Sequence, residues 1–118
     1  MTGVQTCALP ISGTEDEVLG YSVCWTIAGE SHLLNIAVHP AWRGRGIARA
    51  LLTECIRRAA RAGSSVIFLE VRAENEAAQR LYRSMGFTFR GIRKGYYTDT
   101  GEDAVILDRE VRKSDAAR

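Results

Sequence analysis

The spacing of apolar positions changes several times along the chain, and each spacing predicts a different element. Residues 18–28 hold β-branched and aromatic side chains in rough alternation with polar ones, which is typical of a strand. Residues 29–31 indicate a turn. Residues 33–38 form an apolar run closed by Pro40, which predicts a strand covered on both faces.

From Gly46 onward the apolar spacing lengthens to that of a helix. Apolar side chains recur at every fourth position and would share one face: Ile47, Leu51, Cys55 and Ala59. Gly63 is a suitable residue to end this helix. Arginines crowd its last turn, where positive charge is favoured by the negative end of the helix dipole: Arg57, Arg58 and Arg61.

The second half of the chain again alternates strand and helix. Residues 65–72 predict another buried strand, and a shorter helix begins around Asn75, a good N-cap, and ends at Gly86. Residues 87–92 and 104–110 predict two further strands joined by a turn-rich stretch. This order predicts an α/β domain with a mixed, mostly antiparallel sheet flanked by helices.

The two ends of the chain differ from its middle. Residues 1–12 carry no charge and no usable period, and their back-translation resembles, codon for codon, a common short-read sequencing adapter. We therefore expect this stretch to be an artefact and the domain at residues 13–111 to be incomplete at its N-terminus. Residues 112–118 are expected to form a charged, frayed tail.

Composition narrows the function only by exclusion. The net charge of +2 is too small to argue for a nucleic-acid partner, and no apolar run approaches the roughly 20 residues that span a bilayer. Cys7, Cys24 and Cys55 are odd in number and lack metal-binding spacing, and neither histidine has a partner at ligand spacing. We therefore expect no metal, no disulfide framework, no membrane contact and a reducing cytoplasm.

Residues 39–52, HPAWRGRGIARALL, carry the clearest candidate chemistry. Glycines and arginines lead directly into the N-terminus of the first predicted helix, where backbone N–H groups and the helix dipole attract anions. The third glycine of a dinucleotide fingerprint and the Gly-Lys-Ser/Thr of a Walker loop are both missing. The stretch predicts a phosphate site of another kind, although a basic turn on a solvated face would have the same composition.

Two side chains further along could carry proton transfer. Glu70 follows two apolar residues on one face of its strand, where a carboxylate is costly unless it opens into a polar cleft or pairs with Arg72 or another arginine. Tyr82 shares a helix face with apolar residues, so it is either a core aromatic or a phenol, of pKa about 10, that acts as an acid. The pattern alone leaves both choices open.

The motif R-x-x-G-x-A, formed by Arg43, Gly46 and Ala48, resembles the pyrophosphate-binding motif of the GNAT superfamily of N-acetyltransferases. The stretches LLNIAVHP, FLEVRAENEAAQRLYRSMGF and RKGYYTDTGEDAVIL look like its RimI-type branch, which acetylates the N-terminal alanine of a small-subunit ribosomal protein. The likeness runs from about residue 18 to residue 107. It leaves the first elements of that fold unrepresented.

The resemblance implies acetyl-coenzyme A as co-substrate and a protein N-terminus as acceptor. It implies Glu70 as the proton acceptor and Tyr82 as the proton donor to the leaving thiolate. Coenzyme contacts are implied for Asn75 and for two segments, a strand that would pair with the pantetheine arm and a loop around the pyrophosphate: Ile36, Ala37 and Val38, then Arg43, Gly44, Arg45, Gly46, Ile47, Ala48 and Arg49.

Other functions fit parts of the sequence. An aromatic–acidic cluster could receive a peptide N-terminus or be a plain hairpin loop: Tyr96, Tyr97, Glu102 and Asp103. The same fold could acetylate another peptide, a lysine or a small amine, or a truncated chain could bind acyl-coenzyme A without catalysis. An RNA-binding role for the helix arginines lacks interleaved aromatic residues for stacking.

Overall fold

The computed structural model describes residues 3–11 and 14–117. Within these ranges, the elements follow the predicted order of two strands, a helix, a strand, a helix and two strands, and one further strand precedes them. The strands and α-helices are β1 (Gly3–Ile11), β2 (Thr14–Ile27), β3 (Glu30–Val38), α1 (Ile47–Arg61), β4 (Val66–Arg72), α2 (Glu76–Ser84), β5 (Thr88–Tyr97) and β6 (Glu102–Glu110). Two short 3₁₀ helices are η1 (Pro40–Trp42) and η2 (Lys113–Ala117).

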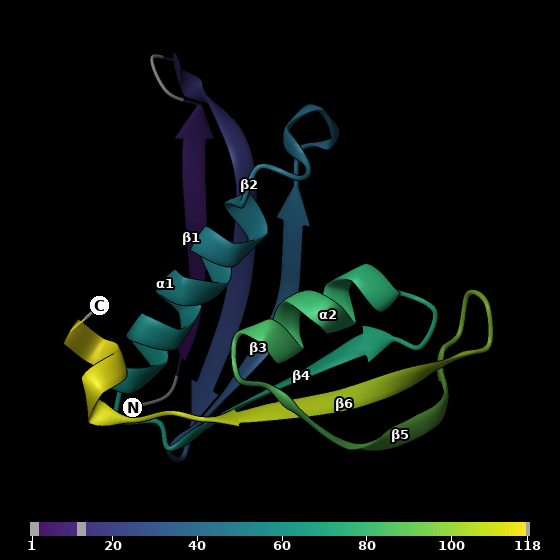
Figure 1. Cartoon of the computed structure of the whole chain (residues 1–118). Helices are drawn as coiled ribbons and strands as arrows, with labels where there is room; N and C mark the ends of the chain where they lie inside the picture. Colours follow the sequence, from purple (N-terminus) through teal and green to yellow (C-terminus); the bar gives the residue numbers. More distant parts are fainter. Residues whose placement is uncertain (1–2, 12–13, 118) are drawn as a thin grey trace.

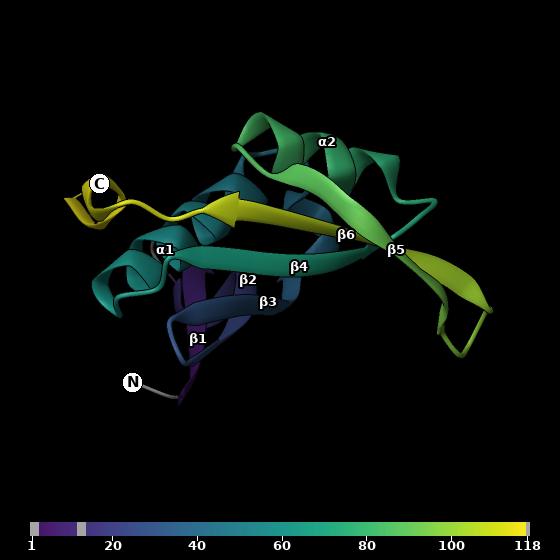
Figure 2. The same cartoon turned by 90° about the horizontal axis from the view of Figure 1, so that it is seen from below.

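The described strands form one sheet in the order β1-β2-β3-β4-β6-β5. All neighbouring pairs are antiparallel except β3 and β4, which run parallel. Both α-helices lie on the same side of the sheet, as Figures 1 and 2 show. The mixed, mostly antiparallel α/β fold predicted from the sequence is therefore confirmed.

The core lies between the helices and one face of the sheet. Every apolar position predicted for one face of α1 is buried: Ile47, Leu51, Cys55 and Ala59. On β4 the side chains of Ile67, Leu69 and Val71 point into this core, while the residues between them are only half-buried. The helical and strand periods read from the sequence thus identify the packed faces correctly.

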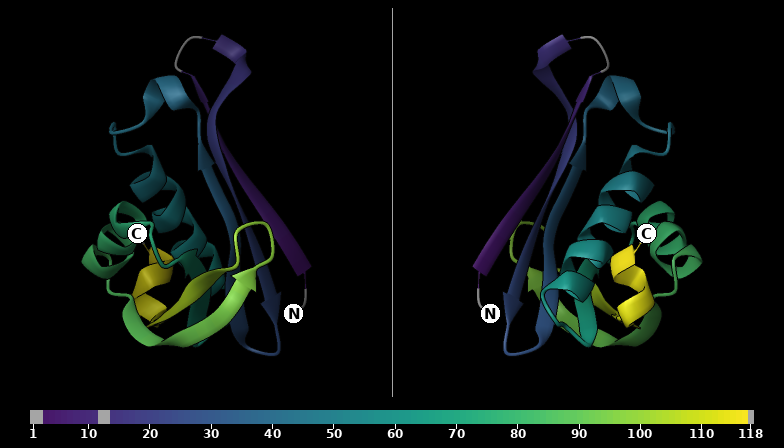
Figure 3. Two further views of the ribbon diagram at one scale, coloured as in Figure 1. Left: turned by 90° about the vertical axis from the view of Figure 1, so that its right-hand side faces the viewer. Right: turned by 90° about the vertical axis from the view of Figure 1, so that its left-hand side faces the viewer.

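The other face of the sheet is open among the described residues, which corrects one expectation. The strand at residues 33–38 was predicted to be covered on both faces, yet Leu34 is 54% exposed. Tyr21, Trp25 and Ile27 of β2 are also exposed, and both views in Figure 3 place the helices on one side of β1, β2 and β3. An apolar run shows that a strand can be buried, but it cannot show what covers it.

Strand β1 was not predicted. It pairs antiparallel with β2, from Gly3 opposite Thr26 to Ile11 opposite Thr14. Backbone N–H and C=O groups form such a ladder, so a segment without apolar alternation can still complete it. The stretch that resembles an adapter thus supplies an edge strand, and residue 12 lies outside the described residues.

The C-terminal segment is ordered by local polar contacts, so the predicted fraying is wrong. Asp115 is only 6% exposed, and its carboxylate lies 3.0 Å from Nη1 of Arg109. The same carboxylate accepts a hydrogen bond from the backbone N–H of Arg112 at 2.8 Å. Arg61 of α1 donates to the carbonyl of Ala116 at 3.3 Å, which holds η2 beside the end of that helix. A charged composition suggests solvation, but here one buried carboxylate binds the guanidinium of Arg109 on β6 and a backbone N–H of its own segment.

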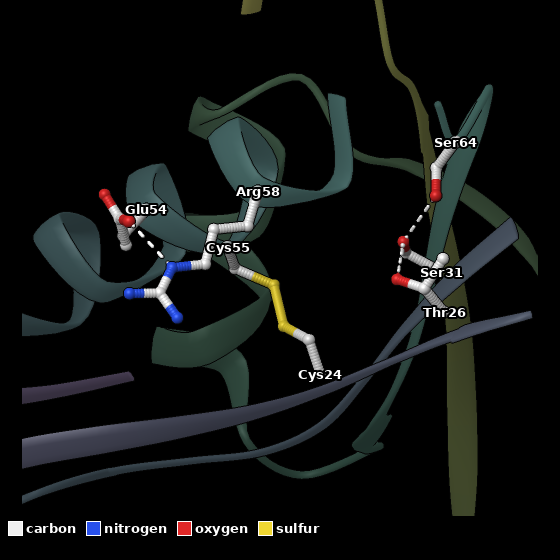
Figure 4. The surroundings of a disulfide bond; sticks show 7 residues. All are labelled: Cys24, Thr26, Ser31, Glu54, Cys55, Arg58 and Ser64. Carbon is white, nitrogen blue, oxygen red and sulfur yellow. Dashed lines mark hydrogen bonds and ion pairs between the residues drawn. A yellow bond between two sulfur atoms is a disulfide. The ribbon is translucent and has the colours of Figure 1, made fainter. Parts of the chain in front are cut away.

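Cys24 and Cys55 form a disulfide between β2 and α1 (Figure 4), contrary to the expectation of none. Their Cα atoms are 6.7 Å apart and 31 residues separate them in sequence. The two cysteines meet because α1 packs across β2. The spacing of cysteines in the sequence does not predict this packing. Figure 4 also shows a chain of buried hydroxyls in which Ser31 bonds Thr26 at 2.9 Å and Ser64 at 2.7 Å.

Candidate active site

The two parallel strands β3 and β4 separate halfway along their length (Figure 1). They pair from Glu30 opposite Val66 to Leu33 opposite Leu69, and no further. Strand β3 has a bulge at Leu34, where the pairing between β3 and β4 ends. Cys24 of β2 is paired with Leu33 and Val23 with Asn35, so Leu34 has no partner on β2. Beyond the bulge, the edge of β3 that faces β4 has no strand partner among the described residues, so its backbone groups can receive an extended ligand.

A cavity of about 500 Å³ lies where the two strands separate. It is lined from the helix side by Ala48, Ala78 and Tyr82 and from the open face of the sheet by Glu70 and Tyr97, among others. It therefore connects the two faces of the sheet. Another hollow of about 520 Å³, lined by Ser65, Arg90 and Arg109 among others, contains none of the predicted site residues.

Glu70 extends from the half-buried face of β4, between the buried Leu69 and Val71. Its Oε2 accepts a hydrogen bond from the Tyr96 hydroxyl at 3.2 Å. Within the described part of the chain, Glu70 takes part in no ion pair. Arg72, the partner considered from the sequence, instead forms ion pairs with two other carboxylates. The structure thus favours the polar-cleft reading of Glu70 over the structural ion pair.

Tyr82 belongs both to the core and to the cavity. Its side chain is 6% exposed, and its ring centroid lies 5.9 Å from that of Phe87. Burial is the main cause that raises the pKa of Tyr82 to about 12, with a smaller contribution from the Tyr97 phenol. Among the described residues its hydroxyl has no hydrogen-bond partner, so this group remains available to a ligand in the cavity.

The glycine–arginine loop connects the end of η1 to α1, as the sequence predicted. Gly44 and Gly46 have φ values of +79° and +78°, which favour glycine, and a Cβ at either position would meet nothing within 4 Å. Gly46 is the N-cap of α1 and offers no side-chain cap, so the first backbone N–H groups of the helix lack partners within it. Such groups form a site for an anion.

The three loop arginines are not equivalent. Arg45 lies with its guanidinium carbon 4.7 Å from the Trp42 ring centroid. Arg49 donates to Oγ of Ser84 at 2.9 Å and so links α1 to α2. Arg43 is exposed, and its side chain has no partner among the described residues. Arg43 is therefore the arginine most available to an anion at this helix end.

The predicted coenzyme residues fall into three groups. Those that line the cavity with Glu70 and Tyr82 are Ile36, Ala48 and Asn75. Those outside it, at the end of β3, along the loop and in the first turn of α1, are Ala37, Val38, Arg43, Gly44, Arg45, Gly46 and Arg49. Ile47 is a core residue packed with Leu51. Asn75 also has the expected N-cap role, because its Oδ1 accepts from the Ala78 N–H at 3.1 Å.

The aromatic–acidic cluster lies on strands rather than in the turn. Tyr96 and Tyr97 end β5, and Glu102 and Asp103 begin β6. Both carboxylates are already engaged: Glu102 accepts from the Glu74 N–H at 2.8 Å, and Asp103 from the Gly95 N–H at 2.9 Å. Tyr97 is the member of this cluster that lines the cavity, and Tyr96 reaches Glu70 through its hydroxyl.

The contact between Arg72 and Tyr97 is not predictable from the sequence. The guanidinium carbon of Arg72 lies 4.0 Å from the Tyr97 ring centroid. The alternation along β4 correctly predicts that Arg72 shares a face with Glu70, but it predicts no other contact for Arg72 than an ion pair with Glu70. The spacing of residues along β4 cannot predict this contact, because Tyr97 lies at the end of β5.

Contacts within the chain engage the arginines that raised the RNA alternative. Arg57 and Arg58 both bind the carboxylate of Glu54, the latter at 2.8 Å. Arg61 contacts η2. Among the described residues, no three His, Cys, Asp or Glu side chains are grouped to hold a metal ion. In the same residues, neither α-helix has the length and apolar character that a membrane span requires.

Comparisons with known proteins agree on one family. The sequence pattern described as the acetyltransferase (GNAT) family matches residues 6–87, which is more than half of the chain. The [ribosomal protein bS18]-alanine N-acetyltransferase of Haemophilus ducreyi is 41% identical over 96 residues, covering 79% of this chain and 66% of that protein. The chain thus spans slightly less than two thirds of the length of this curated relative.

Two solved structures show the same fold. The ribosomal-protein-S18-alanine N-acetyltransferase of Escherichia coli has a TM-score of 0.82 at 35% identity, with 92% of this chain and 69% of that chain covered. The NatC complex bound to Gag peptide and CoA has a chain with a TM-score of 0.82 at 29% identity, covering 92% of this chain and 71% of its own. The second complex holds both a peptide and coenzyme A.

Proposed function

The chain belongs to the acetyltransferase (GNAT) family, and on that premise we propose that it transfers an acetyl group from acetyl-coenzyme A to the N-terminal amine of a protein. The acceptor we propose is the N-terminal alanine of ribosomal protein bS18 or a similar protein, since the relatives at 35–41% identity carry that name. The observation that carries the proposal is one cavity lined by both Glu70 and Tyr82.

Three features of the chain support a place for the coenzyme. The free edge of β3 beyond Leu33 offers backbone groups to an extended pantetheine arm. The loop ending at Gly46 offers unpaired N–H groups and the exposed Arg43 to the pyrophosphate. The neighbour solved with CoA supports an acyl-coenzyme A as co-substrate. When bound, acetyl-coenzyme A supplies the acetyl group and a thiolate leaving group.

Glu70 is suited to receive the proton that the acceptor amine must lose. An α-ammonium group has a pKa of roughly 7.7–8.0, so a carboxylate within reach, directly or through one water, suffices as base. The hydrogen bond from Tyr96 occupies Oε2 and leaves Oε1 open to the acceptor. Because Glu70 lies on the open face of the sheet, we infer that the peptide enters from that side.

Tyr82 is suited to stabilise the leaving sulfur as a hydrogen-bond donor. With its pKa raised to about 12 by burial, the phenol keeps its proton throughout the neutral pH range. A thiol has a pKa of about 8.5, so complete proton transfer from this phenol to a free thiolate would be unfavourable. We therefore assign most of its effect to a hydrogen bond that strengthens as negative charge develops on sulfur.

We also place the protein in the cytoplasm, where acetyl-coenzyme A and ribosomal proteins occur together. The Cys24–Cys55 disulfide is unusual for that compartment, in which thiols are kept reduced. The cysteines therefore do not support a cytoplasmic location, which rests on the proposed substrates alone.

A panel of acceptors tests the proposed function. We expect the chain to acetylate a peptide with the N-terminal sequence of bS18 far faster than the same peptide with a blocked N-terminus and one internal lysine. A small amine such as spermidine should be a poorer acceptor than either peptide. Faster acetylation of the blocked peptide or of spermidine would contradict the proposed acceptor while leaving acetyl transfer intact.

A further inference from the structure

Four side chains form a ring of contacts on the Glu70 side of the cavity: Glu70, Tyr96, Tyr97 and Arg72. All but Tyr96 line the cavity. The Tyr96 hydroxyl donates to Glu70 Oε2 at 3.2 Å, and the rings of Tyr96 and Tyr97 meet edge to face with centroids 5.1 Å apart. The guanidinium of Arg72 stacks on Tyr97 at 4.0 Å. Glu70 and Arg72 share one face of β4, so this strand carries both ends of the series of contacts and completes the ring.

Arg72 is fixed from the outside as well. Its Nη2 lies 3.0 Å from Oδ2 of Asp99, and its Nη1 lies 3.3 Å from Oε1 of Glu102. The other oxygen of Glu102 accepts the backbone N–H of Glu74 at 2.8 Å. One guanidinium thus joins the turn between β5 and β6 to the end of β4 and the segment that leads into α2.

The charges around this ring suit a cationic acceptor. Asp99 and Glu102 together exceed the single positive charge of Arg72, and Glu70 adds a further carboxylate. The Arg72 guanidinium holds the pKa of the Asp99 carboxyl below its usual value, so this acid stays ionised at neutral pH. Arg93, whose guanidinium carbon lies 5.6 Å from the Tyr96 ring centroid, adds a second positive charge beside the ring. The three carboxylates still outnumber the two arginines, so an arriving α-ammonium meets a net negative charge.

We propose that Arg72 is a positioning residue for the acceptor: it fixes Tyr97, and through Tyr97 and Tyr96 the carboxylate of Glu70, where the peptide amine must arrive. This inference rests on the proposed function. Arg72 sets the affinity for the peptide and leaves the affinity for acetyl-coenzyme A unchanged, because its guanidinium contacts the β5–β6 hairpin and not the loop that ends at Gly46. A lysine replaces it only in part, since an ammonium cannot stack flat on a ring and hold two carboxylates at once.

Steady-state kinetics of acetylation of a bS18 N-terminal peptide tests this role. Arg72→Gln should raise the peptide KM by about tenfold or more, because Tyr97 and Glu70 lose their fixed positions, while the acetyl-coenzyme A KM stays within about twofold. Arg72→Lys should fall between this variant and the wild type. The matched control is Arg90→Gln, which removes the Arg90–Asp108 pair at the other end of the same hairpin and should change neither KM.

The outcomes separate this inference from the function on which it rests. A wild-type chain that transfers no acetyl group would overturn both. An active wild type with an unchanged peptide KM in Arg72→Gln, or with both KM values raised alike, would overturn the positioning role alone. If Arg72→Gln does not fold, Asp99→Asn keeps the arginine and removes one of its anchors, and it should raise only the peptide KM, by a smaller factor.

Discussion

Glu70 and Tyr82 line one cavity although they belong to opposite faces of the sheet, Glu70 on the open face of β4 and Tyr82 on α2 in the core. The cavity connects the faces because β3 and β4 stop pairing after Leu33 and Leu69. This arrangement allows the coenzyme and the peptide to approach from different sides and still meet.

Replacing Glu70 by Gln should slow acetyl transfer and spare coenzyme binding. Removal of a positioned base costs about 10²- to 10⁴-fold in rate. The dissociation constant for acetyl-coenzyme A, measured by calorimetry, should stay within about twofold of the wild type. Glu74→Gln is the matched control, since it alters a nearby exposed glutamate whose backbone, not its side chain, is hydrogen-bonded. Unchanged turnover in Glu70→Gln would remove this residue from the mechanism.

The Tyr82→Phe variant separates an acid from a core aromatic. The hydroxyl has no partner among the described residues, so its removal should leave Tm unchanged or slightly raised. Turnover should nevertheless fall by about tenfold or more, because the leaving sulfur loses its hydrogen-bond donor. Thermal unfolding and kinetics on the same sample measure both effects. Full activity at an unchanged Tm would mean that Tyr82 is only a packing residue.

The pH dependence of stability provides an independent test of Tyr82. Its pKa is raised from 10.0 to about 12 by burial, so the unfolded chain loses this proton at lower pH than the folded chain does. Stability should therefore be insensitive to this group below about pH 10 and should fall between about pH 10 and pH 12. Denaturant unfolding across this window should show a smaller loss in Tyr82→Phe. An equal loss in both proteins would contradict the burial of the phenol.

Alanine at Gly46 should weaken coenzyme binding. Its φ of +78° costs a residue with a Cβ about 1–2 kcal/mol, so the backbone N–H groups of the loop should shift. We expect a higher dissociation constant for acetyl-coenzyme A by calorimetry. Gly101→Ala is the control, because its φ of +74° in the β5–β6 turn imposes a similar penalty away from the loop. Equal affinity in Gly46→Ala and the wild type would argue against a pyrophosphate at this helix end.

Reduction of the Cys24–Cys55 disulfide should destabilise the chain. The bond closes a loop of 31 residues, for which the loss of unfolded-state entropy predicts about 3–4 kcal/mol. Denaturant unfolding with and without a reducing agent measures this difference, and Cys7→Ala should preserve it in full. Three titratable thiols in the native wild type, together with an unchanged midpoint on adding reductant, would show that the bond does not form.

Local signals in the sequence were sufficient for much of this structure. The helix after Gly46 and the Asn75 N-cap follow from residues that contact their own neighbours in sequence, and both are confirmed. The alternation on β4 likewise identifies the face that carries Glu70. Each of these signals spans less than one element, which is why a single sequence is enough to find it.

Features that join distant elements were not predictable in this way. The Cys24–Cys55 bond depends on how α1 crosses β2, and the stacking of Arg72 on Tyr97 depends on a hairpin that lies beyond α2. The open face around Leu34 depends on what else covers the sheet. Sequence spacing contains no information about contacts between distant elements. The candidate residues Glu70 and Tyr82 could therefore be predicted, but the ring of side chains around Glu70 could not.

The proposed acetyl transfer is tested most directly by mass spectrometry of a bS18 N-terminal peptide after incubation with the chain and acetyl-coenzyme A. We predict one added acetyl group, on the α-amine of the first alanine, made by the wild type and almost absent with a Glu70→Gln and Tyr82→Phe double variant. A wild type that binds acetyl-coenzyme A but leaves the peptide unmodified, or an equally active double variant, would contradict this proposal.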